Sequence, residues 1–185
     1  MHSFEVEHVD QDKLVHYVHM LGEGAPDQRL NAASCIKRLL GILNAELLDK
    51  IVELNVVPVL VGFLSLDDQT MLQYEAVGAL TNLACSAYTQ KITSDAEPHG
   101  ANAIPQLVRL VASSHALVQD QACTCLGNIA SHNAELRNRI LAVPNSLTTV
   151  LAAVLKPCES LKRTAAWCVL SGFLLHVFLW CWLLF

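Results

Sequence analysis

The sequence predicts an all-α fold, an α-solenoid of about four stacked helical hairpins. Two observations lead to this prediction: blocks of sequence recur at a fixed period, and the apolar residues inside each block follow helical spacing. Composition agrees with it, because the chain of 185 residues is 53% hydrophobic and 16% charged. Such a chain can bury the core of one domain and differs from a disordered protein.

The recurrence involves two pairs of segments. Residues 57–65 match residues 104–112, and residues 76–84 match residues 122–130. In the first pair Pro58 and Pro105 lie 47 positions apart, and in the second Asn82 and Asn128 lie 46 positions apart. Because both pairs recur at nearly the same spacing, each unit of the chain contains both segments.

Each recurring segment is predicted to be a helix. Apolar residues lie three or four positions apart, as at Leu60 and Leu64 in the first segment and at Leu80 and Ala84 in the second. A proline in the first turn of a helix, the place expected for Pro58 and Pro105, removes no intrahelical hydrogen bond. The polar pairs Asp67-Asp68 and Ser113-Ser114 are expected to form turns or helix caps between the two helices of a unit.

The same pattern divides the whole chain. An acidic segment (1–13) is followed by four units (14–55, 56–101, 102–145 and 146–171) and by a hydrophobic tail that departs from the pattern (172–185). One hairpin cannot bury its own apolar face, so the units must stack into a rod with a continuous core. A concave side of such a rod suits an extended partner.

The segments Ala79–Ala84 (ALTNLA) and Cys125–Ala130 (CLGNIA) resemble the armadillo repeat, most closely that of the importin-alpha (karyopherin alpha) nuclear import adaptors. The resemblance extends over residues 14–171 and implies a right-handed superhelix. In that family a groove binds extended, lysine-rich nuclear localisation signals. Tryptophan and asparagine side chains four residues apart, on the third helix of successive repeats, line this groove.

The resemblance implies a peptide-binding site at six positions: Asn82, Asn128, Trp167, Gly78, Thr124 and Ser171. The two asparagines stand at the asparagine positions of the family, and their amides can donate to and accept from a peptide backbone. Gly78 and Thr124 replace the tryptophans of those repeats, whereas the last unit has Trp167 but Ser171 in place of asparagine. Without aromatic rings at two positions, weaker selection of basic peptides is expected.

Two alternatives stay open at this site. Asn82 and Asn128 could instead satisfy backbone carbonyls of the neighbouring repeat, because half-buried amides need partners. Gly78 either lets another group approach the helix backbone closely or marks the loss of a tryptophan.

Several function classes are disfavoured. A formal net charge of −5 provides no basic surface for nucleic acid. The sequence has no phosphate-binding loop, nucleophile elbow or paired catalytic carboxylates, so neither an enzyme nor a cofactor is predicted. Cys123 and Cys125 point about 200° apart on a helix, and His16 and His19 have no third ligand near them in the sequence, so no metal site is predicted.

The expected partner is therefore a protein or extended peptide. The family recruits an importin-beta-type receptor through a basic N-terminal segment, whereas residues 1–13 hold one lysine and no arginine. We do not expect recruitment by that route. Seven cysteines, an odd number, and an acidic N-terminus without a signal peptide indicate buried thiols in the cytoplasm and nucleus. An armadillo scaffold without import activity is the alternative function.

The hydrophobic tail at 172–185 has two interpretations. It is apolar on every helical face, and with Lys162 and Arg163 ahead of it, it could anchor the chain to a membrane from the cytosolic side. Trp180 and Trp182 would then be interfacial residues. Alternatively, the chain stops partway through a longer family member.

Overall fold

The structure, a computed structural model, describes residues 11–42, 44–94, 101–156 and 158–169. Within these ranges it contains eleven helices and no strand. The helices are α1 (Gln11–Glu23), α2 (Pro26–Leu40), α3 (Ala45–Glu53), α4 (Val56–Phe63), α5 (Thr70–Ala84), α6 (Thr89–Thr93), α7 (Ile104–Leu110), α8 (Ala116–His132), α9 (Ala134–Ala142), α10 (Ser146–Val154) and α11 (Glu159–Val169). The predicted all-α fold is confirmed.

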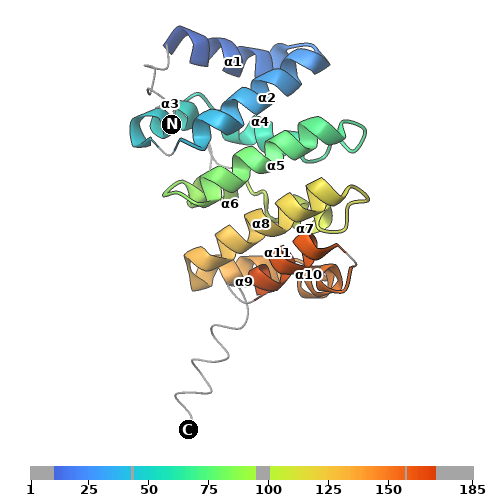
Figure 1. The fold of residues 1–185 in the computed structure, drawn as a ribbon. Coiled ribbons are helices and arrows are strands. Elements are labelled where there is room, and N and C mark those ends of the chain that lie inside the picture. Colours follow the sequence, from blue (N-terminus) through green and yellow to red (C-terminus); the bar gives the residue numbers. More distant parts are fainter. Residues whose placement is uncertain (1–10, 43, 95–100, 157, 170–185) are drawn as a thin grey trace, which may run out of the picture.

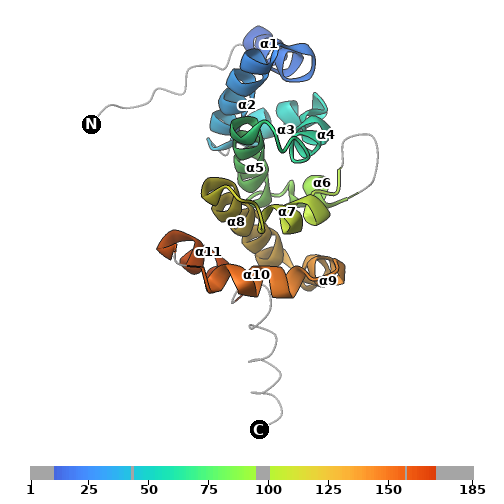
Figure 2. The same ribbon diagram turned by 90° about the vertical axis from the view of Figure 1, so that its right-hand side faces the viewer.

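The helices form an elongated stack (Figure 1). The long helices α2, α5, α8 and α11 follow one another, each packed against the next. In Figure 2 the shorter helices α3, α4, α6, α7 and α9 lie along the other side of this column. A short helix, α3, α6 or α9, precedes each of the pairs α4–α5, α7–α8 and α10–α11. The unit boundaries inferred from the sequence stay a prediction.

The core is continuous along the stack. Residues with helical spacing on α5 and α8 are fully buried: Ala76, Leu80, Leu83, Ala122, Leu126 and Ile129. Helix α5 packs against both α2 and α8, so its apolar side chains belong to two neighbouring layers at once. Each layer therefore depends on its neighbours for burial, as in other solenoids.

Asparagines set the turns around the short helices. The side chains of Asn44 and Asn133 cap α3 and α9 by accepting from the backbone N–H groups of the residues three positions on, at 3.0 and 2.9 Å. Asn55 and Asn145, at the starts of α4 and α10, have left-handed backbone conformations with φ of 61° and 62°. Asparagine tolerates this conformation better than most residues. The turns before α3 and α4 thus recur before α9 and α10.

The loop before α5 is tied to the next repeat by Arg109. Its guanidinium contacts both carboxylate oxygens of Asp67, at 2.8 and 3.0 Å, and donates to the Leu64 carbonyl at 2.6 Å. The Gln73 amide donates to the same two partners, at 3.1 and 2.9 Å. Asp67 therefore links two repeats and does not cap α5, whose N-cap Gln69 makes no side-chain capping bond.

This link predicts a pH-dependent contribution to stability. Hydrogen bonds from Arg109, and then from Gln73, hold the pKa of Asp67 below its ordinary value. A depressed folded-state pKa stabilises the fold above the unfolded pKa of about 4, and the stabilisation is lost as pH falls through the folded pKa. Asp67→Asn is expected to lower the melting temperature at pH 7 and to have progressively less effect below about pH 4. Melting curves of Asp67→Asn and the control Asp68→Asn would test this; a constant difference down to pH 2 would contradict it.

No helix in the described ranges combines the length and apolar character needed to cross a bilayer. The predicted hydrophobic tail at 172–185 lies outside the described residues.

Candidate peptide-binding face

The long helices bring five of the six predicted site residues to one surface. We call this surface the ladder face and define it by Lys37 on α2, Tyr74, Gly78 and Asn82 on α5, Asp120, Thr124 and Asn128 on α8, and Trp167 on α11. Ser171, the sixth predicted residue, lies outside the described part of the chain.

We call each long helix, with its ladder-face residues, a rung. Both asparagines bind the preceding rung through their amide nitrogens. Asn82 Nδ2 donates to the Lys37 carbonyl at 2.9 Å, and Asn128 Nδ2 donates to the Thr81 carbonyl at 3.3 Å and contacts Cys85 Sγ at 2.7 Å. The structural role considered for these residues is therefore confirmed. Within the described residues neither Oδ1 atom accepts a hydrogen bond, and both side chains are half-buried. The Nδ2 atom therefore fixes each amide to the neighbouring helix, and the Oδ1 atom can accept a hydrogen bond from another molecule.

Trp167 lies across bare helix backbone. Its indole covers Gly127 on α8, where Cζ3 and Cε3 occupy the space that a Cβ atom would fill and Cη2 would be 3.1 Å from it. The side chain remains 40% exposed. The ring therefore offers an apolar wall on the ladder face, next to the rung that carries Asn128.

Gly127 is expected to control the position of this ring. Gly127→Ala should displace Trp167, because a methyl group there overlaps the indole. In a Trp180→Phe, Trp182→Phe background, which leaves a single tryptophan, the emission maximum of Trp167 should shift. Gly62→Ala is the matched control, since a Cβ atom there meets no atom within 4 Å. An unchanged emission spectrum for Gly127→Ala would contradict this placement.

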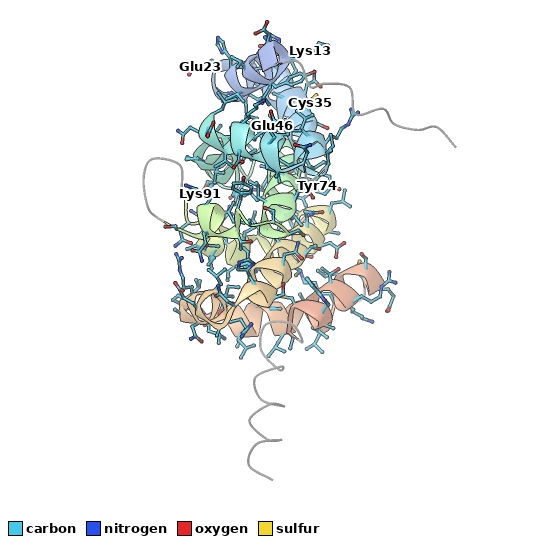
Figure 3. The ribbon with its side chains drawn as sticks, turned by 90° about the vertical axis from the view of Figure 1, so that its left-hand side faces the viewer. Lys13, Glu23, Cys35, Glu46, Tyr74 and Lys91 are labelled. Carbon is cyan, nitrogen blue, oxygen red and sulfur yellow. The ribbon has the colours of Figure 1, made fainter. Side chains whose placement is uncertain are left out.

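The Gly78 position is covered by the chain's own Lys37. A Cβ atom on Gly78 would lie 2.7 Å from Lys37 Cδ, so the lysine stem runs over the helix backbone. The Lys37 ammonium lies 2.5 Å from Glu75 Oε2 and 5.1 Å from the centre of the Tyr74 ring. Of the two alternatives for Gly78, the structure shows a close approach to the backbone. Figure 3 labels Tyr74 on α5.

Asp120 on α8 is a second carboxylate on this face, and side chains of the next long helix, α11, donate hydrogen bonds to it. It accepts hydrogen bonds from Ser160 at 2.8 Å and Thr164 at 2.7 Å, both on α11. Thr124, one turn along α8, donates to the Asp120 backbone carbonyl at 2.9 Å. Both acidic side chains of α5 and α8 described here are thus engaged by neighbouring helices.

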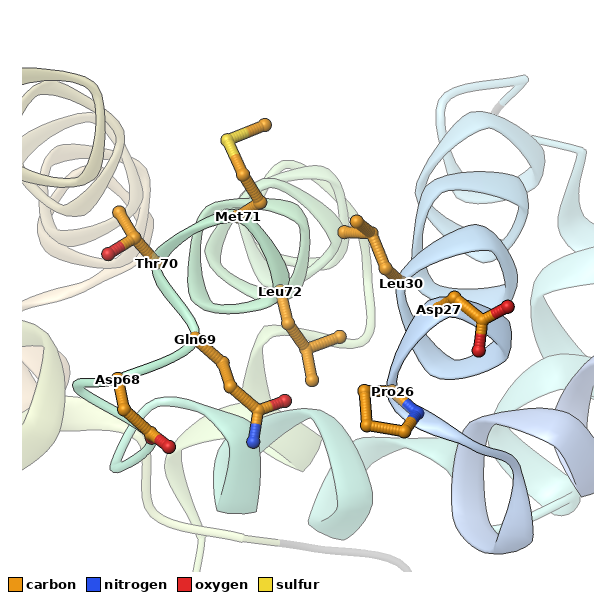
Figure 4. Close-up of a pocket in the computed structure, with 8 residues that line it drawn as sticks. All are labelled: Pro26, Asp27, Leu30, Asp68, Gln69, Thr70, Met71 and Leu72. Carbon is orange, nitrogen blue, oxygen red and sulfur yellow. The ribbon is translucent and has the colours of Figure 1, made fainter.

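A groove of about 410 Å³ opens between the first turns of α2 and α5 (Figure 4). Its apolar lining includes Pro26, Leu30 and Met71, and its rim carries Asp27 and Asp68. Met71 is half exposed, so the groove offers an apolar contact next to the ladder face.

Within the part of the chain that the structure describes, no three His, Cys, Asp or Glu side chains form a group that could hold a metal ion. Burial is the main cause that raises the pKa of both Cys123 and Cys125 to about 12, so these thiols are protonated at neutral pH. The expectation of buried cysteines is wrong for Cys85 and Cys158, which are exposed.

Sequence reasoning missed Lys37, Tyr74, Glu75 and Asp120. A usable signal existed, because Tyr74 precedes Gly78 by four residues and Asp120 precedes Thr124 by four. Residues four apart share one side of a helix, so both face the same surface as the predicted positions.

Comparison with known proteins agrees with this architecture. Residues 44–85 and 100–131 match the Armadillo/beta-catenin-like repeat. The chain is 34% identical over 149 residues to importin subunit alpha-6 of Arabidopsis thaliana, covering 80% of this chain and 26% of the relative. It is 35% identical over 146 residues to importin subunit alpha-1a of Oryza sativa subsp. japonica, covering 78% and 27%. The chain thus spans about a quarter of the length of these relatives.

Solved structures show the same fold. Computationally designed armadillo repeat proteins for modular peptide recognition align with a TM-score of 0.77 and 22% identity, covering 85% of this chain and 63% of theirs. A designed armadillo repeat protein aligns with a TM-score of 0.75, also at 22% identity and with the same coverage. The repeat match, the sequence relatives and the fold agree: the chain is an armadillo-repeat protein similar to importin alpha subunits.

Proposed function

We propose that this chain is a non-catalytic adaptor that holds an extended peptide along the ladder face. The observation that carries the proposal is the orientation of Asn82 and Asn128. Their amide nitrogens are fixed by the preceding rung, and their Oδ1 atoms are left to accept backbone N–H groups of a ligand. An extended peptide presents such N–H groups whatever its sequence.

Two apolar features would add contacts for ligand side chains. Trp167 exposes its ring beyond Asn128, and Met71 borders the groove between α2 and α5. An exposed tryptophan beside fixed polar groups is a common anchor in peptide recognition.

The ligand class that we propose is a nuclear localisation signal, and the process is protein import into the nucleus. The similarity to importin alpha subunits supports both. A role in import would place the chain in the cytoplasm and nucleus.

Paired substitutions of the two asparagines test the binding site. Asn82→Ala with Asn128→Ala removes both acceptors and should weaken peptide binding about 5- to 150-fold, from about 1–3 kcal/mol for two hydrogen bonds. Asn82→Asp with Asn128→Asp keeps the acceptors but removes the donors to the preceding rung, so it should retain more binding despite losing stability.

Isothermal titration with an extended peptide would measure both pairs, and circular dichroism would confirm that they fold. Unchanged binding by the alanine pair would refute the site. Equal loss by both pairs would mean that the asparagines act only through the packing of the rungs.

A second candidate is an armadillo scaffold that uses another face. Helix α10 exposes Leu147 and Leu151, four positions apart and thus on one side of the helix, and Leu155 at its C-cap continues the row. Such an apolar row is typical of a protein contact. A pull-down would test this function. It is favoured if the same partner is recovered with the Asn82→Ala, Asn128→Ala variant as with wild type but is not recovered with Leu151→Asp.

A further inference from the structure

Three successive turns of α5 contact a single residue of the preceding rung. Tyr74 faces the Lys37 ammonium, Gly78 lies under the Lys37 stem, and Asn82 binds the Lys37 carbonyl. Lys37 is therefore held along its whole length, and 26% of its side chain is exposed.

The charge opposite Lys37 is almost buried. Glu75 is 9% exposed, its Oε2 atom is out of contact with solvent, and within the described residues its charged partner is Lys37. The ion pair with Lys37 Nζ, at 2.5 Å, is what compensates this carboxylate. A buried charge without a partner is strongly unfavourable.

We infer that Tyr74, Glu75 and Gly78 form an alkylammonium-binding site that Lys37 occupies in cis. The three groups supply what a lysine side chain requires: a carboxylate, an aromatic ring, and a bare backbone on which the aliphatic stem can lie. While Lys37 fills the site, a lysine of a bound peptide cannot enter it. Lys37 is thus a specificity-determining residue, an inference whose consequence for peptides rests on the proposed function.

The inference differs from a simple loss of lysine recognition at Gly78. If the glycine only marked a missing tryptophan, nothing at this rung would bind a cation. The structure instead shows a site whose occupant belongs to the chain itself. Removing Lys37 should therefore create affinity for an external alkylammonium ion.

Chemical rescue of the Lys37→Ala variant tests the site without any peptide. n-Butylammonium chloride in the tens of millimolar should raise the melting temperature of Lys37→Ala by several degrees, because a ligand of the folded state stabilises it. Sodium chloride at equal ionic strength and 1-butanol at equal concentration should not. Wild type, Lys50→Ala and the double variant Lys37→Ala, Glu75→Gln should not respond to the cation.

Lys50→Ala is the matched control, since Lys50 forms an exposed ion pair with Glu46 on α3 and its loss changes the net charge equally. Should Lys37→Ala be unfolded, the readout becomes recovery of helical circular dichroism with n-butylammonium. No response from Lys37→Ala, or an equal response from the double variant, would overturn the inference.

A peptide titration then tests the consequence. Lys37→Ala should bind a lysine-rich extended peptide at least about tenfold more tightly than wild type does, and the same peptide with norleucine in place of lysine should gain nothing. A gain of the same size for both peptides would overturn the assigned specificity role. Rescue by n-butylammonium without peptide binding in any variant would support the ammonium site and refute the proposed function.

Discussion

Compared with Lys37→Ala alone, a variant that also carries tryptophans at both rungs, Gly78→Trp with Thr124→Trp and Lys37→Ala, is expected to bind lysine-rich extended peptides about 5- to 1000-fold more tightly. Each tryptophan would add an apolar wall and a ring face for an ammonium group, worth roughly 0.5–2 kcal/mol. Lys37→Ala is part of the design because its stem lies where a Gly78 side chain must leave the backbone.

The gain should be specific to charge. A peptide with norleucine at the lysine positions should gain much less, because it lacks the cation–π contribution. Gly78→Trp and Thr124→Trp without Lys37→Ala should give a smaller gain, since Lys37 still competes for the first rung. Fluorescence anisotropy with labelled peptides would measure all of these affinities. Equal gains for both peptides would contradict the expectation that tryptophans at positions 78 and 124 select lysine through cation–π contacts.

Leu80→Ala is expected to lower the free energy of unfolding by about 2–5 kcal/mol. Leu80 is fully buried on α5, a helix that packs against both α2 and α8. The cavity would therefore weaken two adjacent layers, and solenoid layers stabilise one another. The same substitution at Leu155, which is 85% exposed, provides the control and should change stability by less than about 0.5 kcal/mol.

Urea denaturation followed by circular dichroism would compare the two leucine variants. A loss of similar size in both would mean that Leu80 does not belong to a core shared between layers. A loss confined to Leu80→Ala would support the continuous core.

Much of the fold could be predicted because it repeats. The period of 46 to 47 residues and the helical spacing of Leu80 and Leu83 can be found in the sequence alone. Both predict helices that the structure contains. Asp67 lies in the predicted turn before α5, but the hydrogen bond from Arg109 of the next repeat that holds it there was not predicted. That contact spans 42 residues, and local rules carry no information about it.

For the candidate site, the resemblance to the importin-alpha repeat indicates Asn82 and Asn128, but it does not say what each amide binds in this chain. What each amide binds depends on the packing of successive long helices, with partners 45 and 47 residues away. The same holds for Lys37 over Gly78 and for Trp167 over Gly127, where one side chain fills space left by a glycine in another repeat.

Side-chain NMR during titration with an extended peptide tests the central claim most directly. The amide groups of Asn82 and Asn128 and the indole N–H of Trp167 each give a resolvable signal in isotope-labelled protein. The account predicts that these three signals shift together and saturate at one peptide concentration. Saturable shifts confined to α3, α6, α9 or α10, with the three ladder-face signals unmoved, would contradict it.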